Sequence, residues 1–258
     1  MSSARKIALV AGVLFLITFI TSIPALFIFY APVLHNPQYI LGGGADTGVQ
    51  WGAFLEMILI IANIANAVVL FPILKRVNEI LALGYVTARI IESAFIAVGL
   101  LSLLTIVTLR QGAAGADAAS LITAGKSLVA LHDWTFLLGP GFVVGIGNGL
   151  ILGYLMYTSR LVPRAMAMLG LIGGPLIIAS GVGVLFGVIE AGGGWQVIAT
   201  IPEFFWELLL GIWLIVKGFD RSALASLSTT ADDNDGVLTG FDQPAVVPSN
   251  GHRSPSNV

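Results

Sequence analysis

Residues 7–30 read IALVAGVLFLITFITSIPALFIFY, a run without one charged side chain. A helix that crosses a hydrocarbon layer of roughly 30 Å needs about 20 apolar residues, and this run is long enough. The apolar core of a secretory signal peptide has only about 7–15 residues. We therefore expect residues 7–30 to be an uncleaved first membrane span.

The rest of the chain has the same apolar character. Of its 258 residues, 57% are hydrophobic and 10% are charged, whereas soluble domains carry about 25% charged residues. The mean hydropathy is +0.94. The net charge of −2 does not suggest a nucleic-acid partner, and a chain without cysteine has no disulfide or thiol chemistry.

Apolar runs separated by polar connections predict an all-α membrane protein, a bundle of six transmembrane helices. The spans are expected at about residues 7–30, 51–74, 79–109, 128–157, 165–188 and 197–216. Long runs that contain glycine and proline favour helices over barrel strands, which alternate over about 10 residues. The connections at 42–48 and 111–119 are expected to be exposed outside the cell.

The basic residues predict the orientation of these spans, because cytoplasmic connections are enriched in lysine and arginine. With six crossings, most basic residues near the spans fall on one side: Arg5, Lys6, Lys75, Arg76, Arg160, Arg164, Lys217 and Arg221. The other side carries only Arg110 and Lys126. Both termini are therefore predicted to be cytoplasmic.

The chain is expected to consist of a transmembrane domain, residues 1–221, and a tail, residues 222–258. The tail is rich in serine, aspartate, asparagine, proline and glycine. Such a segment cannot bury enough apolar surface to offset the entropy of ordering it. We predict a disordered cytoplasmic tail.

Several polar side chains fall inside the spans, where a charge near the bilayer centre costs about 2.5–3.5 kcal/mol on insertion scales. Arg89 and Glu92 are three residues apart, Glu203 and Glu207 four, and Glu56 and Asn63 seven. These spacings place the two members of each pair on one face of a helix. We expect these side chains to face one another as an intramembrane polar cluster. The candidate residues are Glu56, Asn63, Arg89, Glu92, His132, Asp133, Glu203 and Glu207.

The cluster contains more acids than bases, so some carboxyl groups must be protonated, hydrated or matched by a cation. One hypothesis is a small proton-linked carrier. A second is a structural or partner-binding protein in which the charges only fix helix packing, and a third is an intramembrane enzyme acting on lipid. For His132 and Asp133 alone, the start of a helix at the membrane interface is a further interpretation.

No spacing typical of a metal site, a nucleophile or a cofactor loop occurs in the chain. We assign no catalytic, cofactor-binding or metal-ligating residue, and expect no cofactor. The expected partners are the lipid bilayer and a small molecule or proton, with the oligomeric state left open. Glycines at four-residue spacing predict close helix packing: Gly145, Gly149 and Gly153, Gly170 and Gly174, and Gly183 and Gly187.

Three stretches resemble one known family. They are LKRVNEILALGYVTARIIESA (74–94), YLMYTSRLVPRAMAMLGLIGGPL (154–176) and IPEFFWELLLGIWLIVKGF (201–219). They are similar to the bacterial membrane family of domain of unknown function 4386, over roughly residues 5–220. The resemblance implies a multi-pass protein of the bacterial cytoplasmic membrane and brings no reaction or ligand with it.

Overall fold

The computed structural model describes residues 2–42 and 46–227, and these residues are almost entirely helical. Three short elements, η1, η3 and η4, are π-helical, and η2 is a 3-10 turn. In chain order the elements are α1 (Ser3–Pro24), η1 (Ala25–Phe29), α2 (Ala31–Leu34), η2 (Tyr39–Leu41), α3 (Thr47–Leu74), α4 (Glu79–Gln111), α5 (Ala118–Leu138), η3 (Gly139–Val143), η4 (Gly145–Leu152), α6 (Gly153–Ser159), α7 (Arg164–Leu185) and α8 (Gly194–Val216).

Six helical segments in the described ranges are long and apolar enough to cross a membrane, as the sequence predicts. They are Ser3–Phe29, Thr47–Leu74, Glu79–Gln111, Ala118–Ser159, Arg164–Leu185 and Gly194–Val216. The fourth is the longest because α5, η3, η4 and α6 follow one another without a break in the helical path. The six-helix architecture is therefore confirmed.

The fourth segment begins ten residues earlier than expected, at Ala118 rather than near 128. Asp117 caps this helix by accepting a hydrogen bond from the backbone N–H of Ser120 at 2.9 Å. The prediction that His132 and Asp133 mark a helix start is wrong, because both lie about four turns inside it. The polar side chains of Ser120, Thr123, Lys126 and Ser127 lower the hydropathy of residues 118–127, which concealed this part of the helix from a prediction based on apolar runs.

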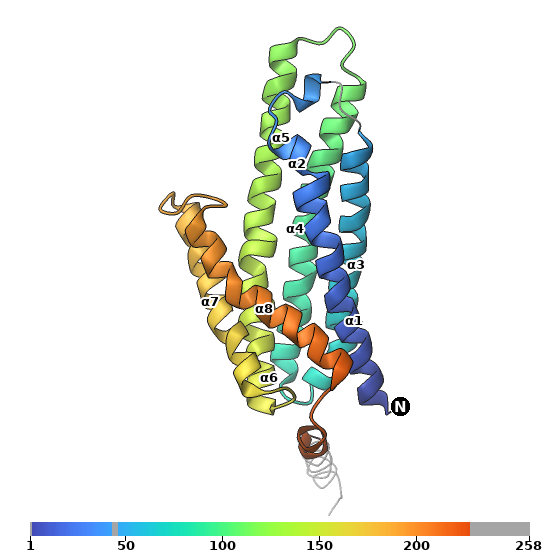
Figure 1. Ribbon diagram of the computed structural model, residues 1–258, viewed down its shortest axis with the longest axis vertical. Helices are drawn as coiled ribbons and strands as arrows, with labels where there is room; N and C mark the ends of the chain where they lie inside the picture. Colours follow the sequence, from blue (N-terminus) through green and yellow to red (C-terminus); the bar gives the residue numbers. More distant parts are fainter. Residues whose placement is uncertain (1, 43–45, 228–258) are drawn as a thin grey trace, which may run out of the picture.

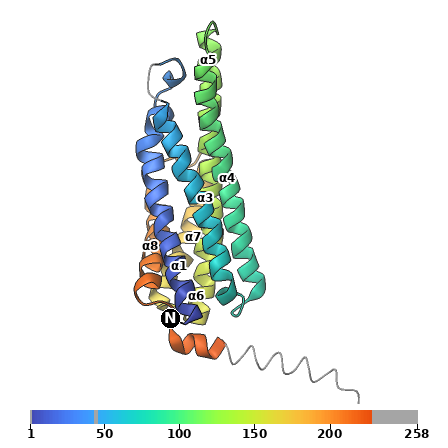
Figure 2. The same cartoon turned by 90° about the vertical axis from the view of Figure 1, so that its right-hand side faces the viewer.

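The helices form an elongated bundle in which α1, α3, α4 and α5 run along the long axis (Figure 1). The α7–α8 hairpin crosses this group at an incline, with α8 against α1 and α7 against η4. The N-terminus, the α3–α4 turn, the α6–α7 turn and the end of α8 meet at one end, which we call the basic end (Figure 2). It carries Arg5, Lys75, Arg76, Arg160, Arg164 and Lys217.

Two apolar cores occupy the two halves of the bundle. The larger contains Leu70, Tyr85, Leu155 and Trp206 and extends to the basic end. The smaller contains Tyr30 and neighbours from η2, α3 and α4 at the opposite end. The polar side chains described below lie between and beside these cores.

Glycines allow η4 and α7 to approach closely, as predicted. A Cβ atom on Gly149 would lie 2.4 Å from the Cα atom of Gly174, and one on Gly174 would lie 2.6 Å from the carbonyl oxygen of Gly145. Gly187 differs from the expectation: it follows the end of α7 with φ +70° and has open space around it. Its role is to end the helix rather than to pack against another.

The expected domain boundary at residue 222 also needs a correction. Residues 221–227 form a short helix across the basic end (Figure 2). Ala223 is buried against the larger core, and Leu224 and Leu227 pack beside it, so this segment has apolar surface to bury. The remainder of the predicted tail, 228–258, lies outside the described residues.

Candidate functional site

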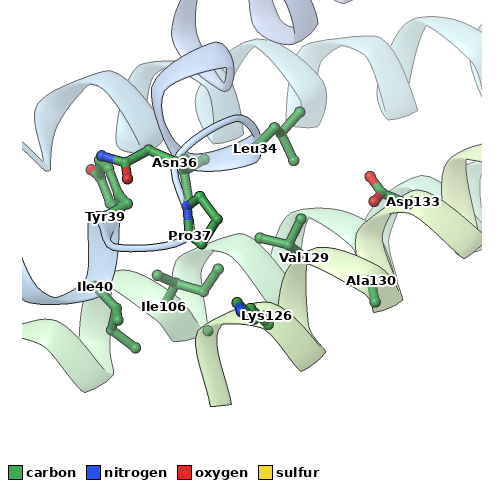
Figure 3. Close-up of a pocket in the computed structure, with 12 residues that line it drawn as sticks. Leu34, Asn36, Pro37, Tyr39, Ile40, Ile106, Lys126, Val129, Ala130 and Asp133 are labelled. Carbon is green, nitrogen blue, oxygen red and sulfur yellow. The ribbon is translucent and has the colours of Figure 1, made fainter. Parts of the chain in front are cut away.

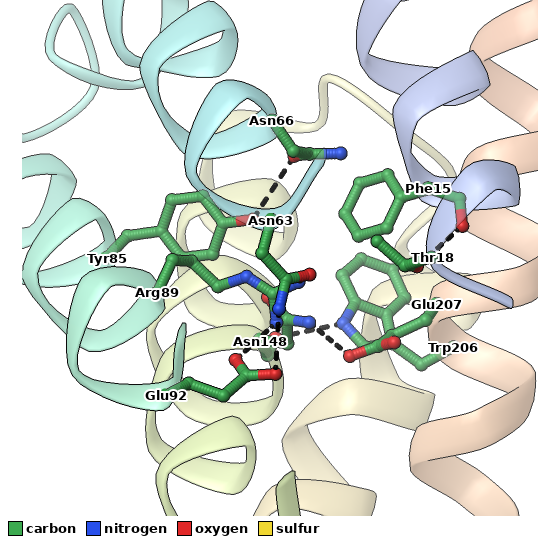
Figure 4. Close-up of polar contacts among 10 residues, drawn as sticks. All are labelled: Phe15, Thr18, Asn63, Asn66, Tyr85, Arg89, Glu92, Asn148, Trp206 and Glu207. Atoms are coloured by element: carbon green, nitrogen blue, oxygen red, sulfur yellow. Dashed lines mark hydrogen bonds and ion pairs between the residues drawn. The ribbon is translucent and has the colours of Figure 1, made fainter. Parts of the chain in front are cut away.

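Asn63, Arg89 and Glu92 contact one another near the middle of the bundle (Figure 4). A guanidinium nitrogen of Arg89 lies 2.7 Å from the Glu92 carboxylate one turn away on α4. The same guanidinium donates to the side-chain oxygen of Asn63 on α3, and the Asn63 amide donates to Glu92 at 3.2 Å. The three side chains therefore close a ring of hydrogen bonds, and none of the three residues is more than 4% exposed.

Asn148 of η4 brings α8 to this ring. Its side-chain amide donates to the Glu207 carboxylate, and its backbone carbonyl accepts the indole N–H of Trp206 at 2.9 Å. The same carbonyl also takes part in the π-helical turn, since it accepts a hydrogen bond from the N–H of Gly153, five residues on. We call Asn63, Arg89, Glu92, Asn148 and Glu207 the Arg89 cluster; Figure 4 shows them facing one another.

A second set of hydrogen bonds ties α1 and α3 to α4 on the side toward the basic end. The Tyr85 hydroxyl donates to the side-chain oxygen of Asn66 at 3.4 Å, and the Asn66 amide donates to the backbone oxygen of Ala11 at 3.0 Å. Tyr85 and Asn66 are fully buried. These contacts hold the three helices in register beside the Arg89 cluster.

Glu203 lies one helical turn from Glu207 and is 2% exposed. Within the described part of the chain, neither of its carboxylate oxygens has a hydrogen-bond partner. A Cβ atom on Gly149 or Gly173 would come within 2.8 or 2.9 Å of one of these oxygens, so glycine leaves the space that the carboxyl group occupies. A buried carboxyl group in these surroundings is costly as an anion.

The charges around Arg89 do not balance. Glu92, Glu207 and Glu203 all lie within electrostatic range of its guanidinium. One guanidinium can neutralise one carboxylate, and a low-dielectric interior does not tolerate two further anions beside it. Two of these three carboxyl groups must therefore carry a proton, be hydrated or be matched by another cation.

Glu56 and His132 form a separate group with Tyr30, toward the end opposite the basic end. The Tyr30 hydroxyl donates to Glu56 at 2.9 Å, and the rings of Tyr30 and His132 meet edge to face with centroids 5.8 Å apart. Glu56 is within electrostatic range of His132. We call these three residues the His132 group; Glu56 is about two helical turns, or about 10 Å, from Asn63 along α3.

Asp133 does not belong to either group, contrary to the expected cluster. Its side chain is 64% exposed, whereas that of His132 is 4% exposed. Successive residues of a helix point about 100° apart, and here the second of the two neighbours is turned to the surface. Among the described residues, no group of three or more histidine, aspartate or glutamate side chains is arranged to hold a metal ion.

The predicted cluster left out five residues that take part in these contacts. Asn66, Asn148, Tyr85, Trp206 and Tyr30 each donate a hydrogen bond to, or accept one from, a buried polar partner. A buried asparagine in a glycine-rich span was a usable signal for Asn148. The aromatic residues gave no such signal, because tyrosine and tryptophan in membrane helices are equally typical of the interface.

Comparison with known proteins gives one match. No curated protein and no solved structure matches the chain. The family model described as "Domain of unknown function (DUF4386)" matches residues 10–218, which include five membrane-spanning segments in full, most of the first segment, and both polar groups. The chain therefore belongs to the DUF4386 family of proteins.

Proposed function

We propose that this protein is a small proton-linked carrier of the bacterial cytoplasmic membrane. The observation that supports the proposal is the excess of carboxyl groups around a single guanidinium in the middle of the bundle. Groups that must hold protons in the interior of a membrane protein are typical of proton relays in pumps and transporters.

The two parts of the site have different roles in this proposal. Arg89, Glu92 and Asn63 are joined to one another by hydrogen bonds and hold α3 against α4. Glu203 and Glu207 are the exchanging groups, because Glu203 has no hydrogen-bond partner among the described residues and Glu207 keeps part of its surface exposed. Loss of a proton from Glu203 or Glu207 would leave an anion on α8 facing Arg89. Attraction between the two charges would favour closer approach of α8 to α4.

The proposed orientation places both termini in the cytoplasm. The basic end carries lysine and arginine side chains around the N-terminus, the two turns and the end of α8. Short connections with this bias remain on the cytoplasmic side during insertion. The His132 group then lies in the outer half of the membrane.

A carbodiimide that dissolves in the bilayer tests the exchanging groups, because it reacts with protonated carboxyl groups in apolar surroundings. We expect mass spectrometry of the purified protein in vesicles to find the label on Glu203 or Glu207. Glu190→Gln is the matched control, since Glu190 is exposed beyond the end of α7. Labelling of neither Glu203 nor Glu207 at any pH would contradict the proposal.

Transport itself is tested with protein in vesicles that contain a pH-sensitive dye. Small cationic and zwitterionic solutes, added in turn, should include one that moves protons with it, and Glu207→Gln should abolish this movement while the variant remains folded. Proton movement that is unchanged in Glu207→Gln and Glu203→Gln would exclude these groups as carriers.

The second candidate is a structural protein, and the closed ring of Asn63, Arg89 and Glu92 favours it. A ring that satisfies its members fixes helix register without any exchange. In that case Glu203→Gln and Glu207→Gln would change only the stability of the protein. They would change neither proton movement nor the carbodiimide labelling of other residues.

A further inference from the structure

A pocket opens at the end opposite the basic end, between the 31–41 segment and helices α4 and α5 (Figure 3). Its volume is about 150 Å³. Most of its lining is apolar, including Val33, Ile40 and Ile106, but α5 contributes Lys126 and Asp133. A water molecule needs about 10–15 Å³ of such space, so the pocket has room for several water molecules.

Asp133 connects this pocket to the buried histidine. Its carboxylate lines the pocket and lies 3.6 Å from Nδ1 of His132. In the described structure this buried nitrogen has no hydrogen-bond partner. An imidazole thus sits with one side in the bundle and one ring nitrogen toward a carboxylate that water reaches.

The groups behind His132 continue inward. Glu56 of α3 and Tyr30, between η1 and α2, are the titratable residues that face it from the other side, joined by their 2.9 Å hydrogen bond. Gly52 leaves room for the Tyr30 ring, because a Cβ atom at this position would lie 2.4 Å from the ring. The pocket, Asp133, His132 and Glu56 therefore follow one another from the surface into the bundle.

We infer that this series is a proton access route from the outer side to the Arg89 cluster. A proton passes from water in the pocket to the Asp133 carboxylate and then to one nitrogen of His132, which releases its other proton to Glu56. Each group returns to its starting charge when it passes the proton on, and the imidazole returns to its starting tautomer by turning over before it accepts the next proton. From Glu56 the α3 face continues for about two turns to Asn63, whose amide contacts Glu92 on α4, and water has to carry the proton across this last gap.

This inference rests on the proposed function, because it supplies protons to Glu203 and Glu207. The test uses the full-length protein in vesicles of defined orientation, with the pH changed suddenly on one side. The infrared band of protonated carboxyl groups, assigned with Glu203→Gln and Glu207→Gln, follows proton uptake. We expect His132→Gln to slow uptake by about a hundredfold, the lower range for a positioned proton-transfer group, and only when the change is on the pocket side.

A matched control separates the route from a general effect. His35→Gln removes an exposed histidine at the same end of the bundle, outside the pocket lining, and should leave the rate unchanged. Asp133→Asn should slow uptake as His132→Gln does, and it remains informative if His132→Gln fails to fold, because Asp133 is exposed.

The outcomes distinguish the two proposals. If the unaltered protein takes up no proton at Glu203 or Glu207, the proposed function fails. If it does take up protons, and Asp133→Asn and His132→Gln do so at the same rate, the carboxyl groups exchange by another path and the access route is overturned. Equal slowing from both sides of the membrane would also overturn it, since the pocket opens on one side only.

Discussion

Arg89 is the residue on which the polar interior depends. Its guanidinium contacts Glu92 and Asn63 and lies within electrostatic range of two more carboxyl groups from α8. Loss of this cation would leave Glu92 buried with the Asn63 amide as a hydrogen-bond donor but without an opposite charge.

We therefore expect Arg89→Ala to lower the free energy of unfolding in detergent by about 3–5 kcal/mol, the range for breaking a buried ion pair. Arg76→Ala is the control, because Arg76 is exposed at the basic end and its loss should change stability by less than about 0.5 kcal/mol. Adding Glu92→Gln to Arg89→Ala should restore part of the loss by removing the unpaired charge. A fully stable Arg89→Ala would show that the ring does not support the fold.

At the scale of elements, two contacts decide how the helices meet: a close approach of η4 to α7 and a cap that starts α5. The cap lies away from the Arg89 cluster, whereas the close approach lies beside Glu203, whose carboxyl group a Cβ atom on Gly149 would meet at 2.8 Å.

The close approach depends on glycine. Gly149→Ala should destabilise the protein by about 1–3 kcal/mol, the usual cost of overpacking, because its Cβ would lie 2.4 Å from the backbone of Gly174. Gly84→Ala is the matched control in α4, where a Cβ would meet only Ile151 at 3.5 Å. Thermal unfolding in detergent should show loss for the first variant and none for the second; equal behaviour would contradict the packing argument.

The cap on α5 has a pH dependence. Hydrogen bonds from the backbone N–H of Ser120, and then from its hydroxyl, lower the pKa of Asp117 below its ordinary value. A carboxyl group whose pKa is lower in the folded state stabilises at neutral pH, and this contribution is lost as the pH falls through that lowered value.

Hydrogen exchange measured by mass spectrometry follows this cap. Asp117→Ala should speed amide exchange in the first turn of α5, residues 118–121, at neutral pH, whereas Asp117→Asn should not, because asparagine caps equally well. In the unaltered protein the same turn should exchange faster, relative to the rest of α5, as the pH falls. An unchanged first turn in Asp117→Ala would mean that the cap does not hold this extension of the helix.

At the scale of the whole molecule, the orientation in the membrane can be tested directly because the chain has no native cysteine. Ala114→Cys lies in the α4–α5 connection and Lys75→Cys at the basic end, and both positions are exposed. A maleimide that cannot cross membranes should label Ala114→Cys in intact cells and Lys75→Cys only after lysis. The reverse pattern would invert the proposed orientation and place the pocket in the cytoplasm.

The sequence alone determined that six helices cross the membrane, because hydrocarbon thickness sets the length of each apolar run. It also indicated that Arg89 and Glu92 share a helix face, since that follows from a spacing of three residues. It failed at the start of α5, where residues 118–127, interrupted by polar side chains such as Lys126, form helix ahead of the predicted span.

Only the tertiary structure decided which polar side chains meet. The rotation and tilt of a helix depend on packing against its neighbours, such as Gly149 against Gly174, and no local pattern encodes them. This is why Asn148 joins Glu207 while Glu56 turns to Tyr30 and His132, and why Asp133, adjacent to His132 in sequence, faces the pocket instead of the interior. The lengths of the apolar runs and the positions of the charged residues identify a membrane protein, whereas helix packing decides which side chains form its site.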